Sequence, residues 1–167
     1  MSAIDALIQE FENEGATTRR VLARVPEARL GWKPHAKSMS LGTLALHVAN
    51  IPGFITDWAL KDSADVGGGE GSPEAKSAAE LLAVHDASIA KAKAALQKLG
   101  DAGLQQNWSM TANGAKLMTI PKGALLRNIA LNHWYHHRGQ LSVYLRLLDV
   151  PVPSIYGPSA DEGPNLG

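Results

Sequence analysis

Six histidines are present in the sequence, and three of them, His133, His136 and His137, lie within a single predicted helix. His133 and His137 are four residues apart, so on a helix their side chains lie on the same face, about one turn apart. Two imidazoles at this spacing can bind one metal ion. The same face carries apolar residues, so we expect the pair to point into the protein: Leu126, Ile129, Leu141, Tyr144 and Leu148.

Imidazole rings in an apolar interior need polar partners for their nitrogens, and a shared metal ion would supply them. His47 is the candidate third ligand, because it lies between Leu44 and Ile51 on the apolar stripe of another predicted helix. We therefore predict a metal site formed by His47, His133 and His137. Three such ligands leave a coordination position for water or substrate, and nitrogen ligands alone are compatible with Zn, Ni, Fe or Cu. The alternative is a purely structural bundle with buried, hydrogen-bonded histidines.

Three more residues are candidates for the surroundings of the metal or for a pocket: Gln140, Arg138 and His85. Gln140 lies one helical turn after His137 and could orient it. Arg138 could pair with a carboxylate or be a solvated surface residue; the carboxylates considered are Asp57, Asp86 and Asp161. His85 lies between apolar residues of a third predicted helix and could face inward.

The roles of the two remaining histidines are left open. His35 lies in a loop rich in proline and glycine, and His136 lies one step off the face of the histidine pair. For both, a hydrogen bond to a neighbouring group is the simpler interpretation. Gly139 lies in the middle of the last predicted helix, where glycine costs about 1 kcal/mol relative to alanine, and a close approach of another helix there would explain its presence.

Four long helices are predicted from the spacing of apolar residues, at 4–25, 40–60, 77–99 and 121–148. Ser77 followed by Glu80 predicts a capping box at the start of the third helix, and Gly100 predicts its end. Pro52 lies inside the second helix and should bend it. Four helices of this length indicate an all-α four-helix bundle.

A short β-hairpin is predicted before the last helix, at residues 107–120. Asn113 and Gly114 in its centre are typical of a tight turn, and two strands of this length must pack on the helices to be stable. Residues 61–73, with Gly67, Gly68, Gly69 and Gly71, predict a flexible loop, and residues 151–167 predict an irregular tail. The length of 167 residues predicts a single domain over 1–167.

The composition excludes several classes of function. Lys plus Arg and Asp plus Glu are 16 each, so the net charge is zero and we expect no nucleic-acid partner. The absence of cysteine excludes disulfides, thiolate ligands and a cysteine nucleophile. Four acidic residues in the first 14 exclude a signal peptide, and no apolar run reaches the roughly 18 residues of a membrane span. We therefore expect a cytoplasmic protein with no membrane partner.

Two segments resemble the DinB-like superfamily, a group of damage-inducible, metal-binding four-helix proteins. They are LGTLALHVAN at 41–50 and NHWYHHRGQL at 132–141, and the tail VPSIYGPSADE at 152–162 resembles one branch of the same group. The resemblance implies an up-down-down-up bundle and a divalent metal ion held by His47, His133 and His137. We expect Zn or Ni first, with Fe, Mn or Cu as alternatives. It also implies a homodimer.

The same resemblance implies a function. Some members are thiol S-transferases or isomerases that use a low-molecular-weight thiol such as bacillithiol or mycothiol, so we expect a metal-dependent enzyme of the thiol S-transferase type with a small-molecule substrate. The alternatives are a metal-dependent hydrolase and a non-catalytic metal- or ligand-binding stress-response module. A di-iron carboxylate protein, a His-Glu-x-x-His zinc protease and a phosphate-binding glycine loop fit poorly, because their motifs are absent.

Overall fold

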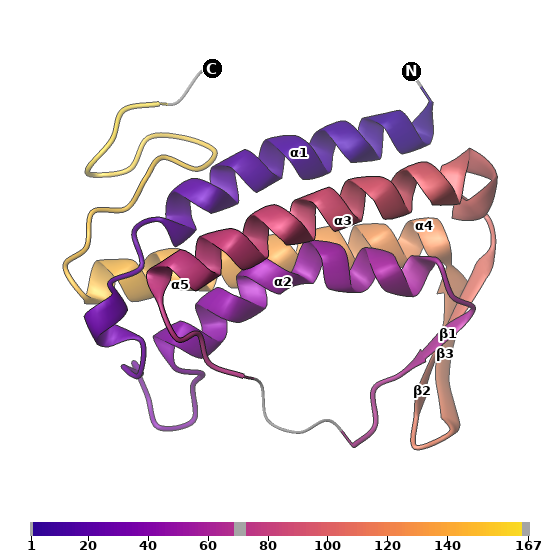
Figure 1. The fold of residues 1–167 in the computed structure, drawn as a ribbon, viewed down its shortest axis with the longest axis horizontal. Helices are drawn as coiled ribbons and strands as arrows, with labels where there is room; N and C mark the ends of the chain where they lie inside the picture. The colour runs from indigo at the N-terminus through magenta and orange to yellow at the C-terminus, as the bar shows by residue number, and fades with distance from the viewer. Residues whose placement is uncertain (1, 69–72, 165–167) are drawn as a thin grey trace.

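A computed structural model describes residues 2–68 and 73–164 of the chain. Three long helices, α1 (Ala3–Leu22), α2 (Leu41–Ala59) and α3 (Ala78–Leu104), pack with a fourth helical run that ends in α5 (His133–Leu147). In Figure 1, α1 and α5 run in one direction and α2 and α3 run in the other. The predicted four-helix bundle with up-down-down-up order is therefore confirmed.

Serine side chains cap the three long helices at their N-termini. Ser77 accepts a hydrogen bond from the backbone N–H of Glu80, as predicted. The carboxylate of Glu80 binds the N–H of Lys76 instead of closing a capping box on Ser77. The predicted break at Gly100 is confirmed: its φ of 62° and ψ of 175° interrupt the helix there, and a further helical stretch follows it before α3 ends at Leu104.

The predicted disturbance of α2 at Pro52 is confirmed by its hydrogen bonds. The N–H of Gly53 donates to the side-chain oxygen of Ser88 on α3 (2.8 Å), and this hydroxyl donates to the carbonyl of Asn50 (3.1 Å). A side chain of α3 thus enters the backbone ladder that proline interrupts. A Cβ atom on Gly53 would lie 2.9 Å from the backbone oxygen of Ser88, so glycine permits the close approach of the two helices here.

The last helical run differs from the predicted uninterrupted α-helix. It consists of α4 (Lys122–Ala124), a π-helix (Leu125–Asn132) and α5. Leu125 and Ala130 of the π-helix are both buried and are five residues apart. A π-helix joins residues at this spacing by its backbone hydrogen bonds.

The predicted apolar face of this run is therefore wrong in part. Leu126 and Leu141 are buried, but the other three predicted residues are only partly buried: Ile129, Tyr144 and Leu148. In α5 the buried side is formed by Trp134, Arg138, Leu141 and Leu145. The core face of α5 thus lies one position further along the chain than the two histidines.

A small sheet packs against one end of the bundle. The hairpin of β2 (Asn107–Ala112) and β3 (Ala115–Pro121) turns at Asn113 and Gly114, which have φ of 50° and 79°, as predicted. The buried Trp108 stacks on Trp58 of α2, with 5.8 Å between ring centroids. The sheet therefore rests on the C-terminal end of α2, as two short strands require.

A third strand, β1 (Ser63–Asp65), lies in the segment predicted to be a loop and pairs in parallel with β2. The carboxylate of Asp65 fixes it to the hairpin turn by accepting from the N–H groups of Asn113 and Gly114. This prediction was wrong because the contact joins residues almost 50 positions apart. Gly69 and Gly71 of the predicted loop lie outside the described residues.

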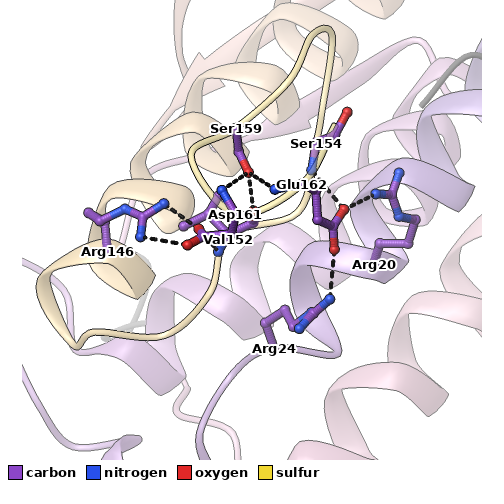
Figure 2. Close-up of polar contacts among 8 residues, drawn as sticks. All are labelled: Arg20, Arg24, Arg146, Val152, Ser154, Ser159, Asp161 and Glu162. Atoms are coloured by element: carbon purple, nitrogen blue, oxygen red, sulfur yellow. Dashed lines mark hydrogen bonds and ion pairs between the residues drawn. The ribbon is translucent and has the colours of Figure 1, made fainter. Parts of the chain in front are cut away.

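The tail has no helix or strand in residues 151–164, as predicted, but ion pairs hold it against the bundle (Figure 2). The carboxylate of Glu162 contacts Arg20 of α1 and Arg24, which follows the end of α1, at 2.7 Å each. Asp161 pairs with Arg146 of α5 and accepts from the N–H of Val152. The pairing with Arg146 and the N–H of Val152 lower the pKa of Asp161, and the N–H of Ser154, followed by Arg20 and Arg24, lowers the pKa of Glu162. The tail thus joins α1 to α5.

None of the helices in residues 2–68 and 73–164 combines the length and the apolar character that a bilayer span requires.

Replacing Ser88 with Ala should lower the free energy of unfolding by about 1–3 kcal/mol, because the N–H of Gly53 and the carbonyl of Asn50 lose a partner at a buried position. Urea denaturation measures the difference. Ser142→Ala is the matched control, since Ser142 bonds only a carbonyl of its own helix, and it should change stability by no more than about 0.5 kcal/mol. Equal effects of the two substitutions would contradict the role assigned to Ser88.

Candidate metal centre

Three histidine side chains converge between α2 and α5. The Nε2 atom of His133 lies 2.8 Å from Nε2 of His137 and 3.4 Å from Nε2 of His47. One ring nitrogen from each residue lies within 4.8 Å of the other two. The structure therefore brings together the three residues that the sequence analysis selected, although 86 positions separate His47 from His133.

These distances fit a single metal ion. Metal–nitrogen bonds of about 2.0–2.1 Å in tetrahedral geometry place two ligand nitrogens about 3.3–3.4 Å apart. The two separations from Nε2 of His133, 2.8 and 3.4 Å, are at or below that value, and all three ligand nitrogens lie within 4.8 Å of one another. The three histidines could thus hold one divalent ion, with at least one coordination position left for another ligand.

Gln140 fixes the tautomer of His137. The Nδ1 atom of His137 lies 2.7 Å from Oε1 of Gln140, and because this oxygen is an acceptor, Nδ1 must carry the proton. In the neutral ring, Nε2 then presents its lone pair to the centre, as a metal ligand must. The sequence analysis proposed that Gln140 orients a ligand, and the structure places it in contact with His137.

Burial keeps the three rings neutral. Burial is the main reason that the pKa of His47 falls to about 4, and the neighbouring rings of His137 and His133 contribute to the same shift. Burial also lowers the pKa of His133 and His137, although the hydrogen bond with Gln140 acts in the opposite direction at His137. Neutral imidazole is the form that binds a metal ion, so at neutral pH no proton competes strongly for the centre.

The centre lies at the edge of the bundle rather than in its core. All three histidines are partly buried, whereas the core side of α5 is formed by residues one position further along, such as Trp134 and Arg138. The expectation that the pair points into the apolar core is corrected accordingly. This position gives a small molecule access to the centre, which a site enclosed in the core would not.

Arg138 does not line the centre, nor is it a solvated surface residue. Its side chain is 1% exposed and pairs with Glu14 of α1 at 2.6 Å. It also donates to Oγ1 of Thr18 and to the hydroxyl of Tyr156 in the tail. The three predicted partners bind other cations: Asp57 binds Lys61, Asp86 binds Arg19, and Asp161 binds Arg146. No pattern in the sequence indicates Glu14 or Tyr156 as a partner of Arg138, because the contact with Glu14 joins residues 124 positions apart.

The other candidates lie away from the centre. His85 is buried, and its Nε2 lies 2.9 Å from the backbone oxygen of Gly15 on α1, so it joins two helices. His35 is exposed and accepts from the N–H of Lys37. His136 is exposed beside His137, with 5.0 Å between the rings. The close approach expected at Gly139 is absent, since no atom lies within 4 Å of a Cβ placed there.

Comparisons with known proteins agree with this geometry. The model of the DinB family matches residues 1–165 of the chain. A protein of Bacillus subtilis (strain 168), described as uncharacterized protein YrdA, is 28% identical over 165 residues, which cover 98% of this chain and 94% of the relative.

Two solved structures have the same fold. A DinB-like protein from Bacillus cereus ATCC 10987 matches with a TM-score of 0.72 and 22% identity, over 91% of this chain and 97% of the other. The DinB-like protein YjoA from Bacillus subtilis matches with a TM-score of 0.68 and 20% identity, over 89% of this chain and 96% of the other. Identities this low show similarity of fold only.

In the metal-free protein, His47 should stay neutral down to about pH 5. The reason is that burial disfavours the imidazolium and lowers the pKa to about 4. A titration of the ring Cε1–H resonance by NMR measures this, with the urea-unfolded protein as the control, in which the same resonance should titrate near the usual pH of about 6.5. Titration of His47 near pH 6.5 in the folded protein would show that the three rings are not packed together.

Proposed function

The chain belongs to the DinB family, and on that premise we propose that it is a metal-dependent enzyme of the thiol S-transferase type. The convergence of His47, His133 and His137 on one point is the observation that supports this proposal. Zn and Ni are the proposed ions, because neutral imidazole nitrogen suits both. A metal ion bound there would lower the pKa of a coordinated thiol, so that the thiolate predominates at neutral pH.

The chain has no cysteine, so the reacting sulfur must come from a low-molecular-weight thiol. The thiol loses its proton to solvent, its sulfur forms a bond to an electrophilic carbon, and the leaving group departs with the electron pair of the bond that breaks. The residues of the protein would position the reactants. Gln140 would hold His137 in the tautomer that binds a metal ion. The three rings are only partly buried, so the two reactants would approach from their exposed side.

Two other activities would use the same residues. A metal-dependent hydrolase would use water in place of the thiol, and a non-catalytic module would bind a metal ion or ligand without turnover. A homodimer, a cytoplasmic location, a single domain over 1–167 and the absence of nucleic-acid and membrane partners stay predictions from the sequence.

Replacing His47 or His137 with Ala should weaken the binding of Zn or Ni at least about tenfold, because each substitution removes one of three ligands. A competition titration with a chromophoric chelator measures the affinity. His35→Ala is the control, since His35 is exposed and bonds only its own loop, and it should bind metal as the unchanged protein does. Equal affinity of all three variants would reject the assignment of ligands.

The metal-loaded protein should transfer a thiol to an electrophile such as monochlorobimane or chlorodinitrobenzene faster than the uncatalysed reaction, because the bound ion increases the thiolate fraction. A panel of low-molecular-weight thiols is tested by absorbance or fluorescence. The rate should disappear on chelation and return with the metal. Tight metal binding without turnover on any thiol would favour the non-catalytic module, and turnover of esters or amides without thiol would favour the hydrolase.

A further inference from the structure

A pocket of about 340 Å³ lies between α2 and α3, on the flank of the bend at Pro52. Its size is at the lower end of the range that binds small molecules, about 300–1,000 Å³. The residues that line it on α2 are Asn50, Gly53 and Phe54, and on α3 they include Val84, Ala87 and Lys91.

Small residues and one exposed aromatic ring form this pocket. Ala87 carries only a methyl group, so the space beside the close approach of the two helices at Gly53 stays open. Phe54 is 55% exposed at the rim and contacts only the ring of Trp58 among the described aromatic residues, at 4.8 Å. A large apolar side chain exposed beside an apolar hollow is typical of a surface that binds a ligand.

The rim of the pocket has an excess of positive charge. Lys91 lies 3.4 Å from Asp57, but the same carboxylate is 2.7 Å from Lys61. One acidic group thus faces two ammonium groups, so a net positive charge remains. Lys91 is the cation that lines the pocket, and an anionic group on a ligand would be attracted to it.

The pocket adjoins the metal centre along α2. Asn50 lies three residues after His47, and Phe54 lies seven residues after it, which is nearly two full turns. With a rise of 1.5 Å per residue, these residues lie about 4.5 and 10.5 Å along the helix from His47. Phe54 therefore projects from nearly the same face of α2 as His47.

We propose that this pocket binds a small organic acid, with the apolar body of the ligand between Phe54, Val84 and Ala87 and its anionic group near Lys91. This proposal does not depend on catalysis at the metal centre. If both proposals hold, a ligand in the pocket lies within one or two helical turns of His47, so the pocket would select the molecule that reacts there.

The probe is 4-phenylbutyrate, which combines an aromatic body with a carboxylate, and its binding to the full-length protein is followed by amide chemical shifts. We expect saturable shifts at Gly53, Val84 and Ala87, and no saturation with 4-phenylbutylamine, which has the same body and the opposite charge. Ala87→Leu fills the pocket from an exposed helix position and should weaken binding at least about fivefold. Lys91→Gln should weaken it at least about threefold, because the charge is lost.

Ala94→Leu is the matched control, since Ala94 is an exposed alanine two turns further along α3 that does not line the pocket, and it should bind the probe as the unchanged protein does. The titration is repeated after treatment with chelator, because a carboxylate could also bind a metal ion. Binding that survives Ala87→Leu but disappears with chelator would place the acid on the metal and overturn the proposal. Equal affinity for the acid and the amine would overturn it as well.

Discussion

The rotation of α5 about its own axis is the constraint on which the metal centre depends. His137 and Arg138 follow each other on this helix and project in directions about 100° apart, the first toward His47 of α2 and the second toward Glu14 of α1. A buried guanidinium is costly unless all its partners are present, so Glu14, Thr18 and Tyr156 hold the helix in one orientation. Ligand geometry must be kept within about 0.5 Å and 10–20°, and the anchor of Arg138 on an adjacent side of α5 restricts the rotation of the helix that carries two of the ligands.

The second helix connects the two candidate sites. Its first half carries His47, and its second half begins near Pro52, where the hydroxyl of Ser88 binds the N–H of Gly53 and the carbonyl of Asn50. The close approach at Gly53 leaves no room for a side chain between α2 and α3 at that point. The space immediately beside it stays open because Ala87 is small. The irregular part of α2 at Pro52 and Gly53 thus shapes the pocket between α2 and α3, a few residues along the helix from His47.

Local features of this fold could be predicted from the sequence, whereas long-range contacts other than the histidine trio could not. The four-residue spacing of His133 and His137, the Asn-Gly turn and the cap at Ser77 each depend on residues a few positions apart. The candidate trio followed because His47 also lies on an apolar stripe of its helix. The ion pair of Arg138 with Glu14 and the strand β1 depend on contacts across more than 40 positions, for which spacing gives no signal.

The π-helix at Leu125–Asn132 helps to set the direction in which His133 and His137 point. A π-helical turn holds one residue more than an α-helical turn, so the same chain wound as one uninterrupted α-helix would present the two histidines on a different side relative to Leu125. Deletion of a single residue that restored the α-helix would, by contrast, leave their direction largely unchanged, because the wider turn accommodates the extra residue. The direction of the two ligands therefore depends on the helix type of the segment before them, and not only on the four-residue spacing between them.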